Sequence, residues 1–389
     1  MRIVHTSDWH AGRLWKNQNR LDELQAVLDH LAGFIERERI DLVLMSGDVF
    51  ENQMPSADAE RAVSTFFKRL GRAGVPSVVI AGNHDHPVRL DTWGLLAEFV
   101  GVQARGLPRR RDQGGIVEVP IRLGELAIVA ALPWAPPGRL VEAGVLAKDE
   151  TEARQRYADG MQQMLAHLAE GFRTGAVNLV VAHSHVTGAV GSGSERVMTM
   201  GEEWMATAQS LPPAAQYVAL GHIHKPQRVA AAAAHAEYAG SPLQMDFGEA
   251  GEDKSFVVIE VAPGLPPKVE RVPYEGGRTL AKWEGTLPEL EQQVEALKAF
   301  GFVRATIRLE SPMPDLNRRA RQILPNIVAV DAVLPVGDGE ASPGSGTGVG
   351  PAKPPMERFR DYYVREHQRP PAEATLELFS ELYHSASIE

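Results

Sequence analysis

Residues 75–87 read VPSVVIAGNHDHP, and this stretch decides how the chain is expected to fold. Its run of Val and Ile is typical of a buried strand, and the run ends at a glycine that is followed at once by four polar side chains. Polar and titratable side chains are costly at the end of a buried strand unless they have a partner there. We therefore expect a functional site where this strand ends. The four side chains are Asn83, His84, Asp85 and His86.

The composition of the chain excludes several classes of protein. A chain of 389 residues, 44% of them hydrophobic, predicts a globular protein with two domains and appendages. The net charge of −10 argues against a simple basic nucleic-acid-binding domain. The absence of cysteine excludes disulfides, thiolate nucleophiles and zinc fingers. Neither a signal-peptide core nor an apolar run of about 18 residues is present, so we expect a cytoplasmic protein without a membrane span.

The first 275 residues (1–275) alternate strand and helix signals. Amphipathic periodicity predicts a helix at 19–39 and another from about Ser56, a plausible N-cap. The short spacing of the last strands suggests antiparallel hairpins and a second sheet packed on the first. Strands are expected at 2–6, 41–45, 75–80, 116–119, 126–131, 177–182, 217–220, 237–240, 255–261 and 268–272.

Three further segments follow this region. Strand and helix signals restart at 276–335, which predicts a small separate α+β domain. Residues 336–355 are rich in Gly and Pro, which is typical of a flexible linker. Within 356–389, Phe359 and Tyr363 share one helical face and Leu376 and Phe379 share another. Two short helices on a long tether cannot bury both faces alone, so we expect them to dock on a partner.

Polar side chains also follow four other predicted strands. In open α/β sheets the carboxyl ends of the strands form the ligand crevice, so five such ends can converge on one site. Each motif alone would fit an ordinary turn, whereas five strand ends that all carry ligand types are hard to explain that way. The ligand-type residues at these ends are Asp8, His10, Asp48, Asn83, His183, His222 and His224.

The ligand types predict the kind of ion. Nitrogen and oxygen ligands without sulfur suit Mn²⁺, Fe²⁺ or Zn²⁺. Seven protein ligands are too many for one ion that must also hold water and substrate, and they suit two ions bridged by a shared carboxylate. His185 follows His183 by two residues and is an alternative ligand; we prefer His183 because it directly ends the apolar run. His86 is expected to be a loop residue.

In this order the motifs resemble those of the calcineurin-like metallophosphoesterase superfamily and, within it, the SbcD family of bacterial nuclease subunits. The resemblance covers roughly residues 1–275 well and the remainder loosely. It implies an α/β fold, a two-sheet αββα sandwich with a small α+β capping domain and C-terminal helices. The segments that carry it are HTSDWHAGR (5–13), SGDVFE (46–51), AGNHD (81–85), LGHIHKPQ (220–227) and AGSPLQMDFGE (239–249).

The resemblance also implies how the site is divided. Two divalent metal ions, most simply Mn²⁺, would be bridged by Asp48. His84 would not bind metal but would face the scissile phosphate, and Asp85 would either orient His84 or cap a turn. One ion would be held by Asp8, His10, Asp48 and His224, and the other by Asp48, Asn83, His183 and His222.

The implied activity is that of a metal-dependent DNA nuclease that processes double-strand breaks and hairpins. It would act as an exonuclease on duplex ends and an endonuclease on single strands and hairpins, as a homodimer in a nucleoid-associated complex with an SbcC-type SMC-like ATPase. The chain has no P-loop motif, so ATP hydrolysis would come from that partner. Residues 356–389 would bind the partner, and 276–335 would cap the site and contact DNA.

DNA binding is expected to be independent of sequence, because no base-reading motif is evident. Arg13, Lys16 and Arg20 lie near a strand end and could meet backbone phosphates. The loop from Arg105 to Arg111 could do the same or could be a solvated surface loop. Two alternatives to the nuclease are a small-nucleotide phosphodiesterase and a non-catalytic scaffold. The scaffold is disfavoured because all seven ligand positions and His84 are filled.

Overall fold

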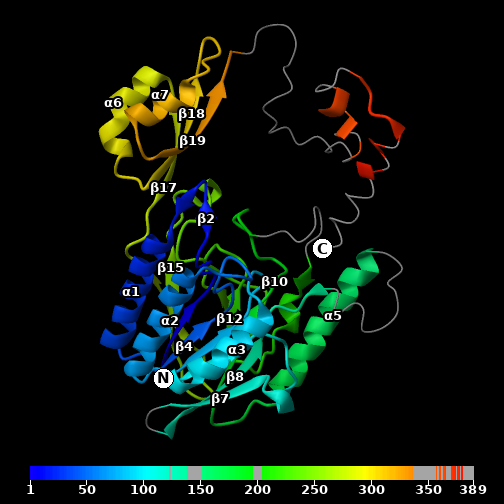
Figure 1. Ribbon diagram of the computed structural model, residues 1–389. Coiled ribbons are helices and arrows are strands. Elements are labelled where there is room, and N and C mark those ends of the chain that lie inside the picture. The colour runs from blue at the N-terminus through cyan, green and yellow to red at the C-terminus, as the bar shows by residue number, and fades with distance from the viewer. Residues whose placement is uncertain are drawn as a thin grey trace. The chain divides into compact units, whose positions relative to one another are not determined.

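Two six-stranded sheets form the centre of the computed structural model (Figure 1). The first has the order β16-β15-β1-β4-β5-β6, with β1, β4, β5 and β6 parallel. The parallel strands are β1 (Arg2–Thr6), β4 (Leu42–Met45), β5 (Ser77–Ile80) and β6 (Val102–Arg105). The antiparallel edge is formed by β15 (Ser255–Glu260) and β16 (Lys268–Pro273).

The second sheet has the order β13-β14-β12-β9-β8-β7. Its four central strands, β14, β12, β9 and β8, run parallel, and β13 and β7 are antiparallel to their neighbours. The strands are β7 (Ile116–Pro120), β8 (Leu126–Leu132), β9 (Val177–His183), β12 (Tyr217–Gly221), β13 (Gln227–Arg228) and β14 (Ala236–Tyr238).

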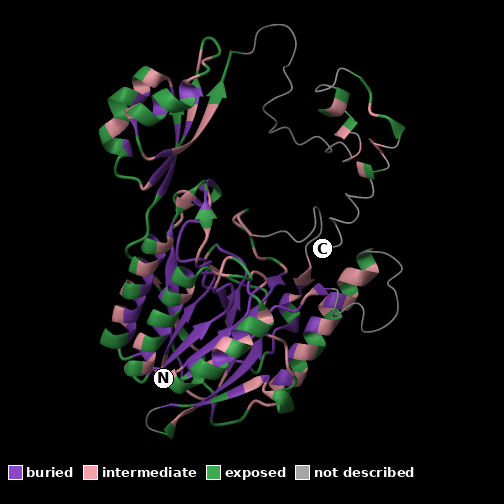
Figure 2. Ribbon diagram, viewed as in Figure 1, coloured by how far each residue is buried: buried purple, intermediate pink, exposed green. Residues whose placement is uncertain are grey.

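Alternate residues of each strand point to opposite faces of its sheet, so each sheet packs on both sides. Ile3 and Leu44 face the second sheet, while Val4 and Val43 face the helices on the other side. Helices α1 (Leu21–Arg37) and α2 (Ala57–Arg72) cover the first sheet, and α5 (Glu150–Ala169) covers the second. Strands buried on both faces read as continuous apolar runs, and Figure 2 shows them buried between helices that expose one side. The predicted αββα sandwich is confirmed.

Several local predictions can be compared with the structure. Ser56 is the N-cap of α2, as predicted: its hydroxyl accepts the backbone N–H of Ala59 at 3.3 Å. Helix α1 is two residues shorter at each end than the predicted 19–39. Helices α3 (Pro87–Ala97) and α5 were not predicted. His86 is the N-cap of α3, where its Nδ1 accepts the backbone N–H of Arg89 at 3.2 Å.

The expectation that the last strands form hairpins of the second sheet is partly wrong. β15 and β16 do form an antiparallel hairpin, but β15 pairs with β1, for example Ile259 with Ile3, and so extends the first sheet. β14 belongs to the second sheet but pairs with β12 in parallel. Spacing along the chain could not predict this, because the choice depends on which strand edge is free in the assembled sheets.

Residues 280–333 form a three-stranded parallel sheet with two helices and a core of their own. Its elements are β17 (Leu280–Gly285), α6 (Leu287–Leu297), β18 (Phe302–Arg308), α7 (Leu316–Ile323) and β19 (Ile327–Val333). It packs on the rest through Trp15 of β2 (Leu14–Trp15), Phe247, Leu280 and Phe302. Hairpin β2–β3, with β3 at Gln18–Asn19, supplies that contact from the first domain.

The structure describes residues 1–121, 124–137, 150–195, 204–335 and parts of 356–379, and the predicted linker at 336–355 lies outside them. The chain divides into two units, Met1–Leu334 and Pro335–Glu389. In the second unit the rings of Phe359 and Phe379 stack at 4.1 Å. Within these described ranges, no helix combines the length and apolar character needed to cross a bilayer.

Candidate metal centre

The ends of five strands from both sheets converge on one site. Asp8, Asp48 and Asn83 follow β1, β4 and β5, whereas His183 ends β9 and His222 follows β12. Glycines at these ends let the backbones approach closely. A Cβ atom at Gly82 would lie 2.6 Å from Cγ of Asp48, and one at Gly221 would lie 2.9 Å from Nδ1 of His183.

Four of the predicted ligands have a left-handed backbone. The φ angles are 52° at Asp8, 48° at His10, 52° at Asp48 and 101° at His222. Residues other than glycine rarely adopt this region, and such strain persists only where the surrounding structure over-determines it, as at functional sites. The backbone is therefore shaped to aim these side chains inward.

One half of the site lies between two imidazoles. Nε2 of His10 and Nε2 of His224 are 3.1 Å apart, and a carboxylate oxygen of Asp8 lies within 4.8 Å of both rings' ligand atoms. Two ligand atoms held about 2.1 Å from one ion at a right angle would be about 3 Å apart. Two facing lone pairs at this distance repel unless a proton or a cation lies between them. The spacing therefore fits a shared divalent ion.

The other half has the same spacing around an amide. Oδ1 of Asn83 lies 2.9 Å from Nε2 of His183 and 3.0 Å from Nδ1 of His222. Oδ2 of Asp48 lies 3.5 Å from Nε2 of His183 and 3.7 Å from Nε2 of His10. Asp48 thus reaches both halves, which is the position that a bridging carboxylate would occupy.

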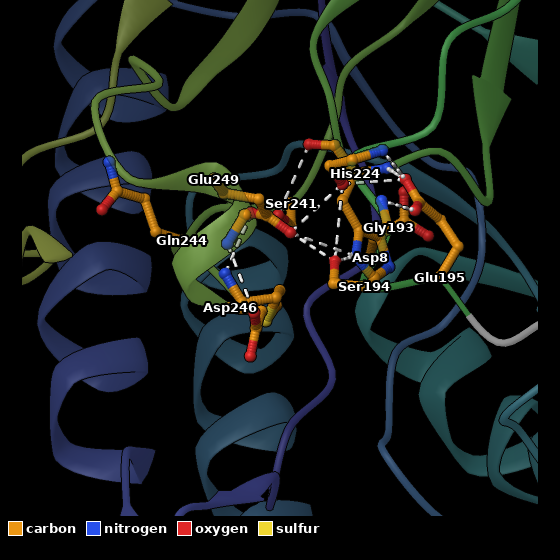
Figure 3. Close-up of polar contacts among 12 residues, drawn as sticks. Asp8, Gly193, Ser194, Glu195, His224, Ser241, Gln244, Asp246 and Glu249 are labelled. Carbon is orange, nitrogen blue, oxygen red and sulfur yellow. Dashed lines mark hydrogen bonds and ion pairs between the residues drawn. The ribbon is translucent and has the colours of Figure 1, made fainter. Parts of the chain in front are cut away.

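Hydrogen bonds fix which ring nitrogen is available. Nδ1 of His183 donates to the carbonyl of Ser46 at 2.8 Å, and Nδ1 of His10 lies 2.8 Å from Oε2 of Glu51. Nδ1 of His224 lies 2.6 Å from Oγ of Ser194 (Figure 3). A partner on one nitrogen sets the tautomer and leaves the lone pair of the other nitrogen for a metal. All three rings therefore present Nε2 to the site.

The charged groups of the site shift one another's pKa values. Burial raises the pKa of Asp48, but His183, His10 and His84 outweigh burial and hold it well below its usual range. Burial lowers the pKa of His183, yet Asp48 outweighs that effect and raises it to about 9. Burial raises the pKa of Asp8 to about 6. In the metal-free protein, a proton on His183 thus supplies positive charge beside the carboxylates.

His84 lies beside His10, with ring centroids 4.7 Å apart and 12% of its side chain exposed. Its backbone N–H donates to Oδ1 of Asp48 at 2.9 Å, and its Nδ1 donates to the carbonyl of Glu51 at 2.9 Å. Nε2 is therefore left for substrate or metal. Its ligand atom is also close enough to those of His10 and Asp48 to join them around an ion, so geometry alone permits either role.

Asp85 does not orient His84, which was one of its two predicted roles. Its carboxylate accepts three backbone N–H groups, from Gly82 at 2.8 Å, Phe50 at 2.9 Å and Val49 at 3.1 Å. Among the described residues it makes no hydrogen bond to His84, whose ring is oriented by Glu51 instead. The geometry fits the alternative of a turn-capping carboxylate that holds two strand-end loops together.

Other predicted residues lie apart from the ligand groups. The ring of His185 is 6.1 Å from that of His222, whereas His183 lies beside Asp48. The expectation that Arg20 meets DNA is wrong, because this side chain is buried in a paired contact with Glu23 at 2.9 and 2.6 Å.

The Arg105–Arg111 loop is largely tied to the protein itself. Arg105 donates to the carbonyl of Gly114 at 2.6 Å, and Arg109 lies 2.9 Å from Asp91. Arg111 lies 3.6 Å from Glu170 on an exposed surface. These contacts fit the alternative of a solvated surface loop.

Sequence reasoning did not single out the groups behind the ligands. Glu51 contacts His10, Ser194 contacts His224, and the backbone N–H of His224 donates to Glu195 at 3.0 Å. Glu249, which is fully buried, lies behind Ser194. Glu51 and Glu249 stand inside the motif segments 46–51 and 239–249, which was the available signal. Ser194 and Glu195 had no signal in the sequence, because their role depends on contact with His224, about 30 residues further along the chain.

Comparisons with known proteins agree with this site. The family model for calcineurin-like phosphoesterases matches residues 1–226. The SbcD subunit of nuclease SbcCD from Bacillus subtilis is 38% identical over 285 residues, covering 73% of this chain and 72% of the relative. The Escherichia coli K12 protein of the same name is 30% identical over 305 residues, covering 76% and 74%.

More distant likenesses were also found. The SbcD subunit of Rhodobacter capsulatus is 30% identical over 349 residues, covering 86% of this chain and 84% of the relative. A solved dimetal phosphatase from Danio rerio is 12% identical with a TM-score of 0.39, covering 70% of this chain and 99% of that one, a likeness too low to bear on activity. On the family match and the closer identities, this chain belongs to the calcineurin-like phosphoesterases and, within them, to the SbcD family of SbcCD nuclease subunits.

Proposed function

We propose that this chain is the metal-dependent nuclease subunit of a two-component DNA-processing complex and hydrolyses DNA phosphodiesters at the site described above. The observation that carries the proposal is the position of Asp48 between two groups of ligand atoms. Within each group the ligand atoms lie about 3 Å apart, which is the spacing expected around one bound ion. Membership of the SbcD family supports DNA as the substrate.

The proposed ligands follow the two halves. Asp8, His10 and His224 would hold one ion, Asn83, His183 and His222 would hold the other, and Asp48 would contact both. When bound, such ions neutralise phosphate oxygens and lower the pKa of coordinated water. The donor set lacks sulfur, which fits Mn²⁺, and Fe²⁺ and Zn²⁺ share that preference. We propose Mn²⁺ as the working ion.

His84 is the proposed catalytic acid. Its Nδ1–H is held by the carbonyl of Glu51, so the ring is oriented and Nε2 is the atom that can carry a proton to the departing sugar oxygen. Its backbone N–H also fixes the Asp48 carboxylate. Asp85 contributes by capping the loop that carries Asn83 and His84, and it is a positioning residue.

A basic groove supports contact with the DNA backbone. Lys16 of the β2–β3 turn, together with Arg278 and Arg321, lines a groove between that hairpin and the 280–333 domain. None of the three forms an ion pair with a described residue, so their charges remain available to phosphates. We propose that residues 276–335 cap the site and bind DNA without sequence preference. Action on the chromosome would place the protein at the nucleoid.

An apolar stripe supports a homodimer. Val88, Leu95 and Phe99 lie on one face of α3 and the turn after it, and their exposed fractions are 55%, 69% and 88%. The opposite face of α3, with Leu90 and Ala97, is already buried in the core. We propose that the stripe packs on the same stripe of a second copy, because contiguous exposed apolar surface marks interaction sites.

A partner ATPase completes the proposed complex. The relatives' shared name describes one subunit of a two-part nuclease. Residues 356–389 carry exposed apolar side chains such as Tyr362 and Leu378 at helical positions. We propose that this segment docks on an SbcC-type SMC-like ATPase. Its deletion should abolish complex formation and leave single-strand cleavage by the isolated chain; an intact complex would contradict the assignment.

The test of the activity is a cleavage assay of the chain alone with Mn²⁺. Substrates are end-labelled duplex, single-stranded circles and bis(p-nitrophenyl) phosphate. His84→Ala should lower DNA cleavage by about 10²–10⁴-fold at unchanged Mn²⁺ content. His86→Ala is the matched control, since this neighbouring histidine lies at the N-cap of α3 and is in none of the ligand groups.

The outcomes separate the candidate functions. Cleavage of DNA that is lost in His84→Ala but kept in His86→Ala supports the nuclease and the role of His84. Turnover of the small ester without DNA cleavage would indicate a small-nucleotide phosphodiesterase. Full DNA cleavage by His84→Ala would refute the assignment of the catalytic acid.

A further inference from the structure

A chain of polar groups runs from His224 into the protein interior (Figure 3). Nδ1 of His224 lies 2.6 Å from the hydroxyl of Ser194, and that hydroxyl also contacts Oε1 of Glu249. Because an ionised carboxylate only accepts hydrogen bonds, the Ser194 hydroxyl must donate to Glu249 and can then accept from His224. This direction places the ring proton on Nδ1 and the lone pair on Nε2.

The far end of this chain is buried and held by several polar contacts. Oε2 of Glu249 lies 2.6 Å from Nζ of Lys254 and accepts the backbone N–H of Met245 at 2.9 Å. Glu249 is fully buried and Lys254 is 8% exposed. Lys254 also donates to the carbonyl of His224 at 3.0 Å. The carboxylate that accepts the Ser194 hydrogen bond is therefore held by a lysine that also contacts His224.

The loop that carries Ser194 is held by a second carboxylate. Glu195 accepts the backbone N–H groups of Ser192 at 2.9 Å, Gly193 at 2.8 Å and His224 at 3.0 Å. The loop and the histidine are thus tied together at the backbone as well as through the side chain. Ser192, in the same loop, bonds Glu195, Glu249 and, at 3.4 Å, the hydroxyl of Ser194, but among the described residues it has no hydrogen bond to His224.

We propose that Ser194 and Glu249 are positioning residues that hold His224 as a metal ligand, an inference that rests on the proposed two-metal function. They fix the tautomer whose Nε2 faces Nε2 of His10 across 3.1 Å. Without the hydroxyl, the ring is free to place its proton on Nε2, and in that tautomer it cannot bind an ion through Nε2. Groups that orient metal-binding histidines in this way typically contribute 10–100-fold to metal affinity.

The competing explanation is that these contacts only fold the loop. Ser192 and Ser194 separate the two explanations, because both bond Glu249 and only Ser194 bonds His224. A purely structural loop would respond alike to loss of either hydroxyl. A positioning role makes the effect specific to Ser194 and restorable by another hydroxyl.

The experiment measures Mn²⁺ binding to the full chain without DNA, by isothermal titration calorimetry. We expect Ser194→Ala to weaken one of two binding events by about 10–100-fold and to leave the other unchanged. Ser192→Ala should bind Mn²⁺ as the wild type does, and Ser194→Thr should restore most of the lost affinity. Glu249→Gln should weaken the same event as Ser194→Ala.

The results distinguish the inference from the function on which it rests. Equal weakening by Ser192→Ala and Ser194→Ala, or wild-type binding by Ser194→Ala, would overturn the inference while the two-metal site stands. A wild-type chain that binds no Mn²⁺ and cleaves no DNA would overturn the proposed function and the inference together.

Discussion

The buried lysine behind the metal site gives a sharp test of the energetics. Nζ of Lys254 has three donors, and all are used: Glu249 at 2.6 Å, the carbonyl of His224 at 3.0 Å and Glu252 at 3.2 Å. The perturbation is Lys254→Met, which keeps most of the aliphatic volume and removes the charge. It leaves Glu249 fully buried without its cation.

The loss of stability expected for Lys254→Met depends on the hydrogen bonds that Glu249 keeps. Removing one partner of a buried ion pair typically costs about 3–5 kcal/mol, because the other charge is left uncompensated. Glu249 keeps the Met245 N–H and the Ser194 hydroxyl, which continue to stabilise the carboxylate. We therefore expect Lys254→Met to lower the free energy of unfolding by about 3 kcal/mol, the lower end of that range.

The assay is urea unfolding of the metal-free chain in a chelator, with Lys225→Met as the matched control. Lys225 pairs with the same Glu252 at 3.9 Å, but its side chain is 46% exposed, so its loss should cost at most about 1 kcal/mol. Adding Glu249→Gln to Lys254→Met should recover part of the loss, since a neutral amide is less costly to bury. Equal effects of the two lysine variants would refute the reasoning.

Three further predictions concern the site and the assembly. Gly82→Ala should lower the Mn²⁺ content measured by elemental analysis, because its Cβ would lie 2.6 Å from Cγ of Asp48. Gly33→Ala, whose Cβ would have its nearest neighbour 3.7 Å away, should leave the Mn²⁺ content unchanged. Phe99→Asp should convert the proposed dimer to a monomer in analytical ultracentrifugation, and Leu265→Asp, at another exposed apolar residue, should leave the proposed dimer intact. Mn²⁺ affinity should rise from pH 6.5 towards about 9, because a bound ion must displace the proton that the raised pKa keeps on His183. That same proton stabilises the metal-free fold below pH 6.5, and its contribution is lost as the pH rises through about 9; a pH-independent calorimetric affinity would contradict this prediction.

Much of the fold could be predicted because its signals are local. Strands such as β4 and β5 are buried on both faces, so their sequences are nearly all apolar and end abruptly where polar ligands begin. The cap of α2 at Ser56 is equally local. The partner of β15 was not predictable, because strand order depends on edges that exist only after the sheets have formed.

Some residues of the candidate site could likewise be predicted from local sequence, and others could not. Asp8, Asp48, Asn83 and His222 could be proposed from sequence because each stands close to the end of a predicted strand. The functions of Asp85 and Arg20 depended on hydrogen-bond partners far along the chain: the backbone of Val49 and Phe50 for Asp85, and the carbonyl of Gln244 together with nearby Glu23 for Arg20.

The residues predicted to bind metal could be picked out from the sequence, because the end of a strand is recognisable from neighbouring residues. Only the tertiary structure decided how those residues are paired and supported. Asn83 meets His183 across 100 positions of the chain, and Ser194 meets Glu249 across 55. Hydrogen bonds act over about 3 Å of space whatever the separation in sequence, so such contacts are fixed only when the two sheets pack together.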